Sequence, residues 1–124
     1  MSDSLSKIPI RITVVDRGEA RGVLNRLTAP LTVEDILKRL PMNTRTSPAA
    51  GFVSILVGIK RGTEKPVSRV EAGTIGYWPR GDALCIYTKD TTPYGHVNRV
   101  GEIQEGLELF QGLRSGSRII IERA

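Results

Sequence analysis

Two residues of the sequence carry side chains that commonly perform covalent or acid–base chemistry, Cys85 and His96, and each is the only one of its type. A cysteine and a histidine could act as nucleophile and base if the fold brought them into contact and a third residue oriented the histidine. The sequence offers no obvious third residue. We therefore expect Cys85, in the run ALCIY, to be a small buried hydrophobic residue, or alternatively a thiol that lines a groove near His96.

The sequence predicts no metal site and no cofactor. With one histidine and one cysteine, a metal site would have to be built largely from aspartate and glutamate. The glycines form neither a dinucleotide-binding GxGxxG motif nor a phosphate loop. We expect His96 to lie in a loop, where it either bonds to the backbone or lines the groove.

Two aromatic residues, Trp78 and Tyr94, are candidates for contact with a ligand. Trp78 precedes Pro79, and a residue before proline favours extended backbone, as at the end of a strand. It is expected either to pack over one end of the fold or to present backbone groups to a bound peptide. Tyr94 lies between Pro93 and Gly95 in a predicted loop, where an exposed aromatic side chain indicates binding.

The composition indicates a cytoplasmic globular protein. One cysteine excludes an internal disulfide, which suits a reducing compartment, and the first six residues do not resemble a targeting sequence. The net charge is +5 and the pI about 9.8, but lysine and arginine are scattered without interleaved aromatic residues, so nucleic acid is not an expected partner. The mostly apolar stretch 51–59 is too short to span a membrane. The composition alone names no partner and leaves the oligomeric state open.

The most informative stretch is 73–87, GTIGYWPRGDALCIY, in which two β-forming runs flank the turn-forming residues PRGD. Proline presets φ and glycine permits the left-handed backbone of a sharp reversal, so we predict a central hairpin. Alternation places Leu84 and Ile86 on one face of its second strand and Cys85 and Tyr87 on the other.

The other elements are predicted from periodicity and turn residues. An alternation that starts at Ile8 predicts a first strand, which pairs with 20–27. Thr32 is predicted to be the N-cap of a short amphipathic helix that Pro41 stops, and 42–50 to be a polar loop. Further strands are predicted at 52–59, 67–70, 97–103 and 118–123, with a helical turn at 106–113.

Many short strands with frequent turns indicate a mainly β fold, either a closed barrel or a sandwich. The length suits one core, since about 120 residues remove roughly two thirds of the unfolded surface from water. We expect a disordered tail of residues 1–6 followed by a single domain of residues 7–124.

The C-terminal half resembles known proteins. The segment 96–113, HVNRVGEIQEGLELFQGL, is similar to the closing segment of cyclophilins. The hairpin GYWPRGDALCIY, followed by a proline-containing loop, resembles the small single-domain cyclophilin-like proteins of bacteria and archaea, whose biochemical role is largely undefined. The resemblance implies a closed eight-stranded β-barrel with one or two short capping helices.

Cyclophilins are peptidyl-prolyl isomerases, which use an arginine beside an apolar proline pocket. The resemblance implies that Arg45 stands for that arginine and Phe52 for a groove aromatic, that Cys85 lies where a second groove phenylalanine would be, and that His96 matches a groove histidine. The methionine, glutamine and tryptophan of the cyclophilin groove have no counterpart.

Three functional hypotheses follow from this resemblance. The first is a binding module without efficient isomerase activity, whose groove takes a small molecule or an extended peptide between Phe52, Trp78, Cys85, Tyr94 and His96. The alternative is a divergent peptidyl-prolyl isomerase that uses Arg45. The third is a partner subunit whose barrel surface serves assembly.

Overall fold

The computed structural model of the chain describes residues 6–93 and 95–124. Residues 1–5 of the predicted tail therefore lie outside the described residues. In chain order the elements are β1 (Lys7–Val14), β2 (Gly18–Asn25), α2 (Pro30–Arg39), β3 (Met42–Arg45), β4 (Ser47–Ala49), β5 (Phe52–Leu56), β6 (Thr74–Trp78), β7 (Ala83–Tyr87), β8 (Asn98–Glu105), the 3-10 helix η1 (Leu107–Phe110) and β9 (Arg118–Arg123).

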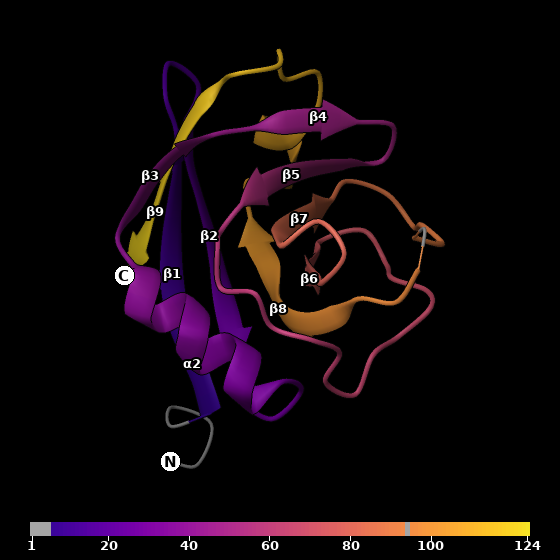
Figure 1. The fold of residues 1–124 in the computed structure, drawn as a ribbon. Helices are drawn as coiled ribbons and strands as arrows, with labels where there is room; N and C mark the ends of the chain where they lie inside the picture. The colour runs from indigo at the N-terminus through magenta and orange to yellow at the C-terminus, as the bar shows by residue number, and fades with distance from the viewer. Residues whose placement is uncertain (1–5, 94) are drawn as a thin grey trace.

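The nine strands form one antiparallel sheet in the order β3-β9-β1-β2-β8-β6-β7-β5-β4. β3 and β4 stand at the two ends of this order, yet only Thr46 separates them in the chain. The segment 42–49 therefore pairs with β9 along its first half and with β5 along its second, which curls the sheet into a nearly closed barrel (Figure 1). The prediction of a mainly β barrel is confirmed.

The prediction of a polar loop at 42–50 is wrong, because this segment closes the barrel. Side chains of β3 and β4 alternate between half-buried and exposed, so the segment contributes backbone hydrogen bonds more than core side chains. Thr46 is buried between the two strands, and its N–H donates to the carbonyl of Ser117 at 2.9 Å. The break at Thr46 is also why the sheet has nine strands where eight were expected.

Aliphatic side chains fill the interior of the barrel. The alternation that predicted the first strand is confirmed in β1, whose inward residues are between 1% and 4% exposed. The space left at the centre is about 10 Å³, which is at the lower limit for a single water molecule. A ligand must therefore bind outside the barrel wall.

The outer face of β7 is covered as well. Leu84 and Ile86 point into the barrel core, whereas Cys85 and Tyr87 join a second apolar cluster with Val70 and Val97. The predicted central hairpin is thus confirmed, with both faces of its second strand buried.

Two irregular segments, 57–73 and the described residues of 88–97 (88–93 and 95–97), cover the outer face of β7. They are joined by two isolated bridges, one between Val67 and Val97 and one between Val70 and Thr91. Residues 67–70 therefore do not form the regular strand that was predicted. The strand predicted at 52–59 likewise ends earlier, at Leu56.

Helix α2 begins three residues earlier than the sequence suggested. Its N-cap is Ala29 and Pro30 opens the first turn, so the prediction that Thr32 is the N-cap was wrong. The carboxylate of Glu64 caps the helix instead: it accepts the N–H of Leu31 at 3.0 Å and the N–H of Thr32 at 2.9 Å. Among the described residues no helix is long and apolar enough to cross a bilayer.

A second carboxylate, that of Asp82, fixes the start of the segment 57–73. Asp82 Oδ1 accepts the hydroxyl of Tyr77 at 2.7 Å and the backbone N–H groups of Ile59 and Lys60 at 3.0 Å each. The hydroxyl of Tyr77 in turn accepts the N–H of Arg61 at 3.1 Å. Both the Asp82 carboxylate and the Tyr77 hydroxyl therefore replace the strand partners that this backbone lacks.

The side chain of Asn98 ties the middle of the same segment to β8 and α2. Asn98 is fully buried; its Oδ1 accepts the N–H of Glu64 at 2.7 Å, and its Nδ2 donates to the carbonyl of Gly62 at 2.9 Å and to the hydroxyl of Thr32 at 3.2 Å. All of its hydrogen-bonding groups are used, as burial of an amide requires.

These hydrogen bonds determine the protonation of the two carboxylates. Burial disfavours the charged form of Glu64, but donors from Leu31 and Thr32 outweigh it and lower its pKa. Burial likewise acts against the ionised Asp82, and donors from Tyr77, Lys60 and Ile59 lower the pKa of that carboxyl. In the unfolded chain both carboxyls return to ordinary pKa values.

We expect the free energy of unfolding to be constant near neutral pH and to fall as the pH drops below about 5. Between the ordinary pKa and the lowered folded value, the unfolded chain binds more protons, so stability rises with pH. Urea denaturation from about pH 3 to pH 8 measures this effect. Asp82→Asn and Glu64→Gln should each lower stability at pH 7 by about 1 to 3 kcal/mol and flatten the acid slope. Glu108→Gln, at an exposed site, is the control, and an equal flattening in it would contradict the assignment.

Candidate functional site

The outer face of β5, β6 and β7 holds a small apolar cavity of about 80 Å³. Its lining residues are Phe52, Trp78, Cys85, Tyr87 and Pro93. Three residues that the sequence placed in a groove, Phe52, Trp78 and Cys85, therefore lie around one cavity. Tyr87 could have been added from the sequence, because alternation puts it on the same strand face as Cys85.

The strand register sets the aromatic wall of this cavity. Phe52 of β5 lies directly opposite Tyr87 of β7, and the two ring centroids are 5.7 Å apart with the planes tilted by 42°. Gly76, on the neighbouring β6, leaves room for the Tyr87 ring: a Cβ there would lie 3.2 Å from Cε2 of Tyr87. The absence of a side chain at Gly76 thus permits the position of the ring.

Trp78 ends β6, where the tight turn 79–82 folds back over its ring. A Cβ at Gly81 would lie 2.5 Å from Cε3 of Trp78, so only glycine fits against the indole. The Nε1 atom of Trp78 is buried and has no hydrogen-bond acceptor in the part of the chain that the structure describes. An unpaired buried donor costs about 1 to 3 kcal/mol, which an acceptor on a ligand would offset.

The cavity is uncharged at neutral pH. Burial raises the pKa of the Cys85 thiol to about 11, although a hydrogen bond with Tyr87 acts in the opposite direction. Burial also raises the pKa of the Tyr87 hydroxyl far above its ordinary value. A thiol in this state is neither a nucleophile nor a metal ligand.

The other predicted site residues lie elsewhere. Arg45 is exposed on β3 and its Nη1 donates to the carbonyl of Gly116 at 3.0 Å. His96 is exposed in the loop before β8, and neither residue is among those that line the cavity. Tyr94 lies outside the described residues. The structure therefore gathers the apolar candidates and leaves Arg45 and His96 apart from them.

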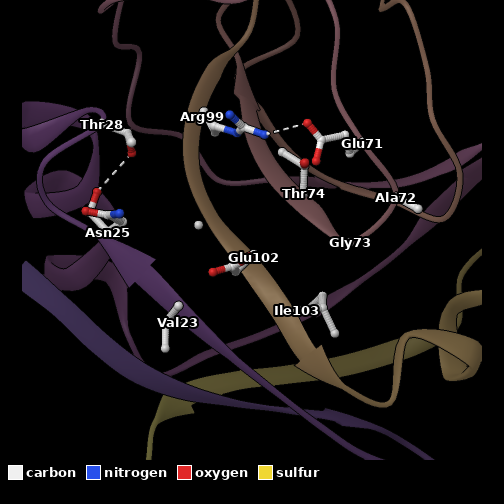
Figure 2. A pocket seen from close by; sticks show the side chains of 11 residues that line it. Val23, Asn25, Thr28, Glu71, Ala72, Gly73, Thr74, Arg99, Glu102 and Ile103 are labelled. Carbon is white, nitrogen blue, oxygen red and sulfur yellow. Dashed lines mark hydrogen bonds and ion pairs between the residues drawn. The ribbon is translucent and has the colours of Figure 1, made fainter. Parts of the chain in front are cut away.

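A polar pocket of about 320 Å³ lies over β2, β6 and β8, and the sequence did not suggest it (Figure 2). In it Arg99 faces Glu71, with 3.6 Å between Nη2 and Oε1, and Glu102 lies further along β8. Its residues come from three separate segments, 23–28, 71–74 and 99–103, which are strand or turn residues without a distinctive motif. No local pattern in the sequence therefore predicts this pocket.

This polar pocket offers hydrogen-bonding groups of both charges to a small polar molecule. The Arg99–Glu71 pair adds little stability, because the Glu71 side chain is 78% exposed. Among the described residues no group of three or more histidine, cysteine, aspartate or glutamate side chains is arranged to hold a metal ion.

Comparison with known proteins agrees with the barrel just described. The family model described as cyclophilin-like matches residues 8–122. This chain belongs to the cyclophilin-like family. The resemblance of its hairpin and closing segment, and the barrel that this resemblance implied, are confirmed.

Two solved structures share the fold of this cyclophilin-like protein. The hypothetical protein AF2241 from Archaeoglobus fulgidus is 26% identical, with 96% of each chain covered and a TM-score of 0.78. McbB, solved in complex with tryptophan, is 17% identical and has a TM-score of 0.73; the match covers 92% of this chain and 44% of that chain. The likeness to McbB concerns the fold alone. No curated protein matches the sequence.

We expect Cys85 to be nearly inert towards iodoacetamide at pH 7.5. A thiol pKa of about 11 lowers the thiolate fraction, and hence the alkylation rate, by more than about a hundredfold relative to a free cysteine. Mass spectrometry of the labelled protein over time measures the rate, with labelling in urea as the positive control. His96→Ala should leave the rate unchanged. Rapid labelling that His96→Ala abolishes would instead show a reactive thiol paired with this histidine.

Proposed function

We propose that this cyclophilin-like protein is a binding module that holds one apolar group of a small molecule or an extended peptide in the cavity of Phe52, Trp78, Cys85, Tyr87 and Pro93. Two observations support this: an apolar cavity that Trp78 helps to line, and the buried, unpaired indole N–H of that same side chain. Apolar walls with a few placed polar groups are typical of ligand sites.

The size of the cavity limits the group that it can take. A cavity of about 150 Å³ lined by apolar side chains holds benzene. At about 80 Å³ this one suits a smaller group, such as a proline ring or a branched aliphatic chain. The remainder of the ligand would lie outside, along the surface of β5 and the loop that carries Pro93.

The indole N–H favours a ligand with a carbonyl beside its apolar group. Trp78 Nε1 is a donor only, so it needs an acceptor. In a peptide, the carbonyl that precedes a proline ring is an acceptor of this kind. A proline-containing peptide, or a small acylated ring of the same size, therefore matches both the cavity and the donor.

The proposal includes the absence of efficient isomerase activity. Stabilising a twisted prolyl amide requires a strong donor, for which cyclophilins use an arginine. Among the described residues no cationic side chain lines the cavity, and the guanidinium of Arg45 is held by the carbonyl of Gly116. Binding without catalysis is what this set of side chains supports.

We expect the peptide acetyl-Ala-Ala-Pro-Ala-amide to bind and to change the fluorescence of Trp78, the only tryptophan, whereas the glycine analogue does not. Cys85→Met fills the cavity and should weaken binding by about tenfold or more. Trp78→Phe removes the N–H and should weaken binding by about five- to tenfold. Calorimetric titration measures both variants.

Leu56→Ser is the matched control, because Leu56 lies on the same β5 but is 71% exposed. It should bind as the unmodified chain does. If Cys85→Met and Trp78→Phe also bind with unchanged affinity, the peptide binds elsewhere and the proposal fails.

We expect no acceleration of prolyl isomerisation beyond about twofold at high protein concentration in a protease-coupled assay. The barrier of roughly 20 kcal/mol requires a directed donor that the cavity lacks. Arg45→Ala should give the same rate. Catalysis that disappears in Arg45→Ala would establish the alternative function, a divergent isomerase that uses Arg45.

A further inference from the structure

Four arginines, Arg17, Arg45, Arg114 and Arg118, gather at one end of the barrel and are called here the arginine cluster. They lie around the turn between β1 and β2 and the segment that leads into β9, at the top of the view in Figure 1 and away from α2. A hollow of about 460 Å³ lies there, lined by Val15, Asp16, Arg17, Gly112, Leu113, Arg114, Ser117 and Arg118. Arg45 adjoins it through its cross-strand partner, Arg118.

Two of these arginines oppose each other directly. Arg45 of β3 and Arg118 of β9 are partners in the antiparallel ladder, and both side chains are exposed on the outer face. Like charges in this position destabilise a sheet. Their hydrogen bonds go to neutral groups: Arg45 donates to the carbonyl of Gly116, and Arg118 donates to Oδ1 of Asn43 at 3.3 Å.

Arg17 is held in the same manner, by backbone carbonyls. Its guanidinium donates to the carbonyl oxygens of Leu109 at 3.2 Å, Gln111 at 2.7 Å and Gly112 at 3.3 Å. These bonds fix the position of the charge without neutralising it. Asp16 is the one carboxylate among the residues that line the hollow.

Five of the nine arginines outside the cluster form ion pairs with described residues. Ion pairs join arginines to carboxylates at Arg11, Arg21, Arg26, Arg61 and Arg99. Within residues 6–93 and 95–124, no member of the arginine cluster makes such a pair. Four guanidinium groups without a carboxylate partner among the described residues therefore lie at this end of the barrel, three of them in the lining of the hollow together with Asp16.

We infer that the arginine cluster binds the phosphate group of a small phosphorylated molecule. Guanidinium groups match phosphate oxygens with two parallel hydrogen bonds, and an anion between Arg45 and Arg118 would remove their mutual repulsion. The volume of the hollow, about 460 Å³, is ordinary for a small-molecule site. Val15 and Leu113 in its lining offer apolar contact to the rest of the ligand.

The lining favours a small molecule over a nucleic acid. Proteins that hold single strands stack bases on aromatic side chains along a basic groove. No aromatic residue lines this hollow among the described residues, and Asp16 would repel a continuous run of phosphates.

The test is a titration of the ¹⁵N-labelled protein at constant ionic strength with glucose 6-phosphate, with inorganic phosphate and with glucose. We expect saturable shifts of the amides of Gly112, Ser117 and Arg118 with both phosphates and none with glucose. Arg118→Gln should weaken phosphate binding by about five- to tenfold. Arg123→Gln, at the opposite end of the same β9, should change it by less than about twofold.

Arg45→Gln provides a second variant. In the absence of phosphate, both Arg45→Gln and Arg118→Gln should be at least as stable as the unmodified chain, because each removes a like-charge contact. Inorganic phosphate should raise the melting temperature of the unmodified chain more than that of either variant. Absence of saturation, or equal weakening in Arg123→Gln, would show general screening and overturn the proposal. Tighter binding of a single-stranded oligonucleotide than of glucose 6-phosphate would also overturn it, in favour of a polyanion surface.

Discussion

The segment between β5 and β6 runs from residue 57 to residue 73 without regular secondary structure, so its backbone groups must find partners outside a strand ladder. Side chains of the barrel supply them: the carboxylate of Asp82 and the hydroxyl of Tyr77 near its start, and the amide of Asn98 further along. The carboxylate of Glu64, within the segment, in turn caps α2. This segment also carries Val67 and Val70, which cover the outer face of β7. The apolar cavity beside Cys85 therefore depends on hydrogen bonds made several residues away from it.

Local patterns in the sequence predicted the elements whose determinants are local. The central hairpin was found because its turn residues and both strands lie within fifteen residues, 73–87. The segment 42–50 was missed because its strand partners, β9 and β5, supply the reason for its extended form and its own side chains are mostly polar. The N-cap at Thr32 was wrong for a similar reason, since the capping carboxylate belongs to Glu64, 32 residues further along the chain.

The two candidate sites differ in how visible they were from the sequence. Phe52, Trp78 and Cys85 were predicted because aromatic residues and cysteine are rare in this sequence and stand in predicted strands. The pairing register of β5, β6 and β7 then places them around one cavity. The arginine cluster could not be found this way. Its members are far apart in the chain, and basic residues scattered along a sequence can still converge in space once strands pair. Arg45, which the cyclophilin resemblance associates with isomerisation, contributes to that convergence through its position opposite Arg118.

The place of β9 in the sheet has a consequence for biosynthesis. It lies between β1 and β3, although it is the strand that leaves the ribosome after the other eight. Until residues 118–123 emerge, the nascent chain carries two facing strand edges with unpaired N–H and carbonyl groups, the form in which strands of neighbouring chains associate. Closure of the barrel is thus a late step in synthesis, because the edges of β1 and β3 stay open until β9 pairs with both.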